Sequence, residues 1–180
     1  AFENAYHGLG YGALNATWRS NFRSPFRRQI GRFASFVPFP RVKADLTKLE
    51  QRLAVECRKH NVSAILVEPI QGRGGTNIPP AGFLKLLRKV CDQQGALLIC
   101  DEVYTGFRLA PGGAQEYFNV RADMVCYGKT LGGGMPIGVV CGPKVLMARS
   151  DNLKPLRVNY VVGTFSAHPL AMASMNLFLK

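Results

Sequence analysis

Apolar residues recur at helical spacing in two segments of the chain, and each pattern predicts an amphipathic helix. The first helix is expected to begin at Asp45, as its capping residue, and to end near His60. The second is expected to run from Phe83 to Cys91 and to close at Gly95 in a left-handed conformation.

Short unbroken apolar runs lie before, between and after these helices and predict strands buried on both faces, as in parallel sheets. The runs are Ala64 to Val67, Ala96 to Cys100, Met124 to Tyr127 and Ile137 to Cys141. Because strands alternate with helices along the chain, we expect right-handed crossovers. The fold class is therefore predicted to be α/β, a mostly parallel sheet with helices on both faces.

Three of these runs are followed by a charged residue, either at once or after one glycine. Glu68 follows the first strand, Asp101 the second and Lys129 the third. Ligands of open parallel sheets bind at the carboxyl ends of the strands, so the three side chains are expected to share one crevice.

Composition favours one domain, since 180 residues with 47% apolar content are enough for one sizeable core. No apolar run is long enough for a membrane span, and no signal peptide is recognisable, so we expect a cytoplasmic protein. The start at Ala1 and the end at Lys180, straight after an apolar run, suggest a piece of a longer protein. The cysteines show no CxxC spacing and predict buried free thiols, with no metal site or disulfide; they are Cys57, Cys91, Cys100, Cys126 and Cys141.

The formal net charge of +12 is concentrated near the start of the chain. Between Glu3 and Asp45 there is no acidic residue, whereas arginines and aromatic residues alternate there. Such a segment is compatible with single-stranded nucleic acid, with an anionic small ligand, or with a surface loop whose aromatic residues pack on the domain or on a partner subunit. We favour the packed loop and expect no nucleic-acid partner.

Asp101 and Lys129 each have two interpretations when taken alone. A carboxylate after a buried strand needs a cationic or hydrogen-bonding partner to stay ionised, for which a protonated heterocyclic nitrogen would serve, but it is also a common loop cap. A lysine before three glycines can become a Schiff-base nucleophile, but it is also an ordinary surface residue. The P-loop motif GxxxxGK[ST] is excluded, because no glycine stands six positions before Lys129.

Taken together, several motifs resemble the class III aminotransferases, and most closely their glutamate-1-semialdehyde aminomutase branch. The motifs follow in family order over nearly the whole chain: Tyr6-His7-Gly8, Glu68 to Gly72 (EPIQG), Pro80 to Leu84, Gly95 to Arg108, Gly128 to Gly138 and Gly163 to Ala173. The resemblance implies the large domain of the aspartate aminotransferase-like (fold type I) transferases, with pyridoxal 5'-phosphate as cofactor.

The resemblance also implies roles for single residues. Lys129 corresponds to the lysine that forms the Schiff base with the cofactor and then shuttles protons, and Asp101 to the aspartate that keeps the pyridine nitrogen protonated. Tyr6 corresponds to the aromatic residue that stacks on the ring, with His7 beside it, and Val103 to the contact on the opposite face. Thr164 corresponds to a residue that reaches the cofactor phosphate of the neighbouring subunit, which implies a homodimer. Glu68 is expected to provide hydrogen bonds at the rim.

Three positions depart from the wider family. Tyr104 stands where many class III transaminases have glutamine, and Arg73 stands where ornithine-type members have glutamate. Arg73 is either a substrate-carboxylate ligand or a solvated loop residue. His168, where many relatives have asparagine, is expected to be structural.

The family pattern predicts a single domain that is incomplete at both ends. We divide it into a basic and aromatic loop-rich segment (1–44), an α/β core (45–150) and a subunit-contact segment (151–180). The phosphate-binding element is expected before Tyr6 and a small domain after Lys180.

The expected function is pyridoxal-phosphate-dependent transfer of an amino group, from a small-molecule donor to a keto or aldehyde acceptor or within one substrate. The alternatives are a racemase or decarboxylase with the same cofactor, and a non-catalytic fragment or pseudoenzyme with a basic binding surface.

Overall fold

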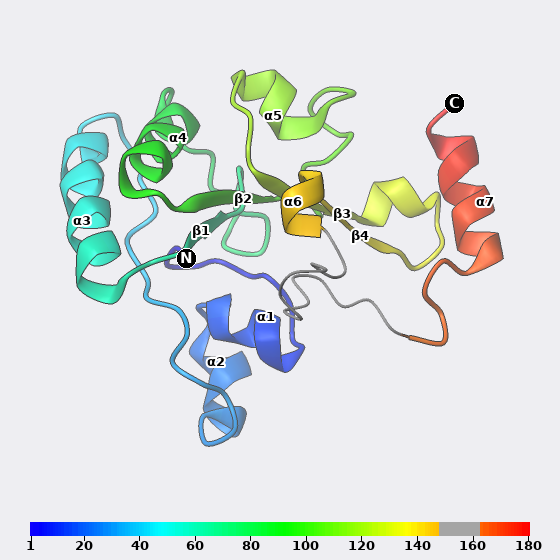
Figure 1. Ribbon diagram of the computed structural model, residues 1–180, viewed down its shortest axis with the longest axis horizontal. Helices are drawn as coiled ribbons and strands as arrows, with labels where there is room; N and C mark the ends of the chain where they lie inside the picture. The colour runs from blue at the N-terminus through cyan, green and yellow to red at the C-terminus, as the bar shows by residue number, and fades with distance from the viewer. Residues whose placement is uncertain (148–162) are drawn as a thin grey trace.

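The computed structural model describes residues 1–147 and 163–180. A four-stranded sheet lies at its centre, in the order β1-β2-β3-β4 (Figure 1). Strands β1 (Ala64–Val67), β2 (Leu97–Asp101) and β3 (Met124–Gly128) are parallel, and β4 (Gly138–Cys141) pairs antiparallel with β3. The mostly parallel sheet predicted from the apolar runs is thus confirmed, with strand ends that differ by at most one residue.

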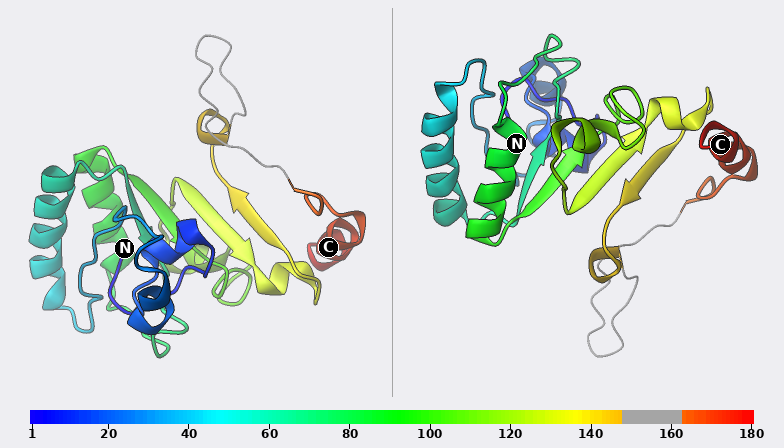
Figure 2. Two further views of the ribbon diagram at one scale, coloured as in Figure 1. Left: turned by 90° about the horizontal axis from the view of Figure 1, so that it is seen from below. Right: turned by 90° about the horizontal axis from the view of Figure 1, so that it is seen from above.

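Helices cover both faces of this sheet (Figures 1 and 2). On one face, α4 (Phe83–Gln94) packs on β1 and β2, and α3 (Asp45–His60) packs against α4. The short helix α5 (Gly113–Phe118) lies over the same face. Gly95 ends α4 with a φ of +67°, which confirms the predicted left-handed cap.

Asp45 does not cap α3, contrary to the sequence-based expectation. Ala44 holds the cap position, and Asp45 is the first helical residue. Its carboxylate reaches backward and accepts hydrogen bonds from the backbone N–H groups of Arg41 (2.8 Å) and Val42 (3.0 Å). These bonds lower the pKa of Asp45 and close the turn that leads into the helix.

The N-terminal segment crosses the other face of the sheet and carries α1 (Tyr11–Ala16), α2 (Ser20–Arg23) and a 3-10 turn, η1 (Ser24–Phe26) (Figure 2). Its first strand-like residue, Phe2, bridges to Val37 and lies in the core. The Phe2 ring contacts Phe39 and Phe83 edge to face, with centroids 5.9 and 5.4 Å apart. The segment is therefore fastened to α4 by aromatic packing.

After β3 the chain forms a 3-10 turn, η2 (Lys129–Gly132), followed by β4 and α6 (Lys144–Met147). The proposed boundary between residues 150 and 151 lies outside the described residues. Helix α7 (Pro169–Phe178) packs on η2, where the Ser174 hydroxyl donates to the Gly132 carbonyl (2.8 Å).

The cysteines are free, and their burial differs from the prediction. Cys57, Cys91 and Cys100 are buried, whereas Cys126 is half-buried and Cys141 is exposed on the outer strand β4. Burial raises the pKa of the Cys91 and Cys100 thiols to about 12, which keeps them protonated. Among residues 1–147 and 163–180, no helix is both long and apolar enough to cross a membrane.

Candidate active site

A cavity of about 520 Å³ opens at the carboxyl ends of β1, β2 and β3. The three charged residues predicted to meet there do so, and the N-terminal segment supplies the opposite wall. Six of the seven predicted site residues line it: Tyr6, His7, Glu68, Asp101, Val103 and Lys129. Parallel pairing places these strand ends at one edge of the sheet, which explains why residues far apart in sequence converge.

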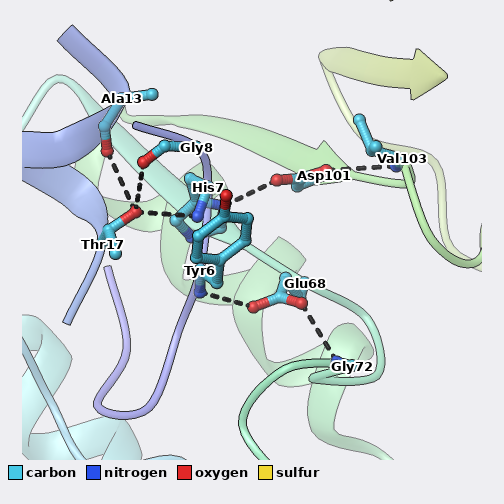
Figure 3. Close-up of polar contacts among 9 residues, drawn as sticks. All are labelled: Tyr6, His7, Gly8, Ala13, Thr17, Glu68, Gly72, Asp101 and Val103. Carbon is cyan, nitrogen blue, oxygen red and sulfur yellow. Dashed lines mark hydrogen bonds and ion pairs between the residues drawn. The ribbon is translucent and has the colours of Figure 1, made fainter. Parts of the chain in front are cut away.

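Asp101, the last residue of β2, is held at both carboxylate oxygens (Figure 3). One oxygen lies 2.7 Å from Nδ1 of His7, and the other accepts a hydrogen bond from the backbone N–H of Val103 (3.1 Å). Because a carboxylate only accepts, Nδ1 of His7 carries the proton. Lone pairs remain on both oxygens, so Asp101 is able to accept a further N–H from a ligand.

His7 is fixed in turn by Thr17, a buried residue behind it (Figure 3). The backbone N–H of His7 donates to Oγ1 of Thr17 (2.9 Å), and this hydroxyl donates to the Gly8 carbonyl (3.0 Å). Nε2 of His7 is buried and has no hydrogen-bond partner among the described residues. One ring nitrogen of His7, Nδ1, is thus hydrogen-bonded to Asp101, and the other, Nε2, has no partner among the described residues.

Glu68 follows β1 and is buried, with 6% of its surface exposed. Its two oxygens accept hydrogen bonds from the backbone N–H groups of Tyr6 (2.8 Å) and Gly72 (3.1 Å). Burial raises the pKa of the Glu68 carboxyl, and the two hydrogen bonds oppose that shift. Glu68 therefore ties the N-terminal segment to the loop after β1, in accordance with the hydrogen-bonding role expected of it.

Lys129 stands at the junction of β3 and η2 with a φ of +45°, in the left-handed region that non-glycine residues rarely adopt. Such a conformation costs of the order of 1 kcal/mol and is typical of functional sites. The next residue, Thr130, donates its hydroxyl to the Gly106 carbonyl (3.0 Å) and fixes the turn. A Cβ at Gly106 would lie 2.7 Å from the Glu102 carbonyl oxygen, so only glycine permits this close approach.

Two tyrosines bring cations into the cavity. The Arg73 guanidinium lies 4.7 Å from the centroid of the Tyr6 ring, and Nζ of Lys129 lies 5.9 Å from that of Tyr104. Arg73 forms no ion pair within the described part of the chain.

Thr164 is not part of this cavity. It is exposed and lines a separate hollow with residues of the segment 135–139 and of α7. His168 lies at the cap position of α7, also outside the cavity.

The sequence analysis missed the contact between His7 and Asp101, because nothing in the chain relates residues 94 positions apart. It also missed the role of Glu102, which is fully buried and accepts hydrogen bonds from Thr105, Ala114 and Gln115. An acidic residue placed 11 positions before the glycine that opens α5 is too weak a signal to have found it.

The donor set fits a flat heteroaromatic aldehyde. Lys129 supplies a primary amine for carbonyl chemistry, and Asp101 supplies an acceptor for a protonated ring nitrogen. Tyr6 and Val103 provide apolar surface for a ring. Within the described residues, no group of three or more histidine, cysteine, aspartate or glutamate side chains is arranged to hold a metal ion.

The chain is similar in sequence to several proteins of known name. The chain is 51% identical over 181 aligned residues to the glutamate-1-semialdehyde 2,1-aminomutase of Hyperthermus butylicus, covering 96% of this chain and 40% of that protein. It is 49% identical over 122 residues to the enzyme of the same name from Alkaliphilus oremlandii. That match covers 68% of this chain and 28% of the other protein. To the acetylornithine aminotransferase of Methanopyrus kandleri it is 38% identical, with 97% and 41% covered. The chain thus spans less than half the length of the relatives that it matches.

Solved structures agree with this likeness. An amine transaminase from an uncultivated Pseudomonas species, in its PLP-bound form, superposes with a TM-score of 0.83 at 27% identity, covering 99% of this chain and 44% of that one. The omega-transaminase of Thermomicrobium roseum gives 0.82 at 28% identity, with 99% and 42% covered. The sequence profile of the class III aminotransferases matches residues 1–180. The chain therefore belongs to the class III aminotransferase family.

Proposed function

We propose that this chain is the cofactor-binding part of a pyridoxal 5'-phosphate enzyme that transfers an amino group, either between two substrates or within one. The observation that carries the proposal is that the Lys129 amine and the Asp101 carboxylate line the same cavity, from the ends of neighbouring strands. The family relationship supports the same function.

In this proposal six residues of the cavity have a defined task. Lys129 would hold the cofactor covalently and would carry protons at Nζ. Asp101 would accept a hydrogen bond from the protonated ring nitrogen, and His7 positions Asp101 through the bond to its Oδ2. Tyr6 and Val103 would pack against the ring, and Glu68 holds Tyr6 in place through the backbone. When bound, the cofactor supplies an electron sink for the substrate carbon that loses a proton.

We further propose a homodimer, in which 151–180 is the subunit-contact segment and Thr164 reaches the cofactor phosphate of the partner subunit. The exposed position of Thr164, outside the Lys129 cavity, supports a contact with another chain.

We propose a cytoplasmic location, which the free thiols of the described cysteines support, since disulfides are rare in reducing compartments.

Reductive trapping tests the catalytic proposal. The full-length protein is mixed with pyridoxal 5'-phosphate, reduced with borohydride and digested, and the modified peptide is identified by mass spectrometry. We expect the label on Lys129 and a loss of trapping in Lys129→Gln. Lys85→Gln is the matched control, because Lys85 is exposed on α4 and lies outside the cavity. Labelling of another lysine in the wild type, or unchanged labelling in Lys129→Gln, would overturn the proposal.

A further inference from the structure

Another concave site is lined by the segment that follows α1. This segment lies below the sheet in the view of Figure 1. The site has a volume of about 720 Å³ and we call it the arginine hollow. Arg23, Arg27, Arg28 and Arg32 line it together with Trp18 and two hydroxyl residues, Ser20 and Ser24. None of these residues lines the Lys129 cavity.

The arginine hollow has positive charge without a counter-charge. None of its four arginines forms an ion pair with a described residue, and the chain has no acidic residue between Glu3 and Asp45. Lys89 on α4, by contrast, has an acidic partner in Glu50 (2.6 Å). Four guanidinium groups around one concavity repel one another, and an anion in the middle offsets that repulsion.

Part of the arginine hollow is held rigid. The Arg23 guanidinium lies 5.1 Å from the centroid of the Phe36 ring, and Trp18 packs on the same ring at 5.1 Å. Nε of Arg23 is buried and has no hydrogen-bond partner among the described residues. An unpartnered buried donor is costly, so the Arg23 side chain would gain from any acceptor that its Nε could reach.

We propose that the arginine hollow binds an anion with two or more phosphoryl groups. The planar guanidinium fork matches phosphate oxygens in pairs, and four forks call for more negative charge than one phosphate provides. The volume also exceeds that of a single phosphate. A concavity formed by one short stretch of chain suits a compact anion better than a nucleic-acid strand, which needs an extended basic groove.

Calorimetric titration of the full-length protein tests this site with two probes, inorganic tripolyphosphate and ATP, and with adenosine as the uncharged comparison. We expect both probes to bind and adenosine not to bind. Equal affinities would identify the phosphoryl chain as the whole ligand, whereas tighter ATP binding would add stacking on Trp18, and both results support the site. Absence of binding by both probes would overturn it, as would binding of a single-stranded RNA that tripolyphosphate does not displace.

Two double variants test whether the anion binds in the arginine hollow. Arg27 and Arg28 are exposed, so the double substitution Arg27→Gln with Arg28→Gln leaves the packed Arg23 in place. We expect it to weaken binding by about tenfold or more, because charge-assisted hydrogen bonds are lost. Arg58→Gln with Lys59→Gln removes the same charge from the exposed end of α3 and is expected to leave affinity within about twofold. Equal losses in the two double variants, or loss of binding in Lys129→Gln, would overturn the assignment.

Discussion

The two walls of the Lys129 cavity are built differently. The strand side carries Glu68, Asp101 and Lys129 at the ends of β1, β2 and β3, whose apolar residues form the core. The N-terminal wall, with Tyr6 and His7, is irregular backbone, and the hydrogen bonds that these two residues donate to Glu68, Thr17 and Asp101 hold it in position.

The residues proposed for the covalent chemistry therefore lie on one wall, and the residues proposed to position the ring lie on the other. The proposed nucleophile and ring partner lie on elements whose geometry the whole sheet determines. The residues proposed to cover the ring lie on a segment whose position depends on individual polar contacts and on one aromatic cluster. Changes in the core are therefore expected to affect both walls, whereas changes at the contacts affect the N-terminal wall first.

The largest effect is expected from Phe83→Ala, which removes the ring that joins α4 to Phe2 and Phe39. Phe83 is 1% exposed, so the substitution leaves a cavity in the core. We expect the free energy of unfolding to fall by about 3–5 kcal/mol, as for other buried phenylalanines. Denaturant unfolding followed by circular dichroism measures the loss.

Phe33→Ala is the matched control, because Phe33 is 89% exposed and belongs to the N-terminal segment. Its effect is expected to stay within about 0.5 kcal/mol. The comparison of the two walls would fail if both alanine variants lost stability equally. Greater protease sensitivity of the N-terminal segment in Phe83→Ala, with the sheet still folded, would show that this wall detaches before the strand side unfolds.

A smaller effect is expected from Glu68→Gln, which acts at the contact between the walls. The amide keeps one acceptor oxygen for the N–H groups of Tyr6 and Gly72, and the other N–H loses its partner. We expect a loss of about 1–3 kcal/mol in unfolding free energy under mildly acidic conditions. Reductive trapping at Lys129 should persist, since Asp101 and Lys129 are unchanged.

The same variant is expected to change the pH dependence of stability. Burial raises the pKa of the folded Glu68 carboxyl, so the folded state binds its proton more tightly than the unfolded state. The contribution of this group to stability is therefore full below its ordinary pKa and declines as the pH rises through the raised one. The stability difference between wild type and Glu68→Gln should narrow from acidic to neutral pH. If the stability difference between wild type and Glu68→Gln widened instead, the folded state would favour the charged carboxylate of Glu68 over its protonated form.

The strand side was predictable from the apolar pattern of the sequence, whereas the residues of the N-terminal wall were predictable only through family resemblance. Unbroken apolar runs mark buried strands, and the parallel arrangement then brings Glu68, Asp101 and Lys129 to one edge. The contact of His7 with Asp101 has no local signal, because it depends on how a long irregular segment folds back across the sheet. The placement of Tyr6 and His7 near the ring rested on family resemblance, and their position on the cavity agrees with it.

Predictions from the hydrophobic pattern were also wrong at two places on the edge of the fold. The apolar character of the run around Cys141 predicted burial, yet β4 is the outer strand and that thiol is exposed. An apolar run shows that a strand forms but does not show which neighbours cover it. Likewise, an acidic residue at the start of a helical pattern does not distinguish a cap from a residue such as Asp45, which binds the preceding turn.

The smallest effect is expected at an exposed contact of the N-terminal segment. The exposed hydroxyl of Tyr11 donates to Oε1 of Gln29 (2.8 Å), while the Tyr11 ring packs on Phe26. Tyr11→Phe removes only the hydrogen bond, which water replaces on both sides, so we expect the unfolding free energy to change by about 0.5 kcal/mol or less. Trapping at Lys129 should be unaffected. A loss as large as that of Glu68→Gln would mean that this outer turn unfolds together with the cavity wall, and the two walls would then form one cooperative unit rather than a rigid side and a fastened side.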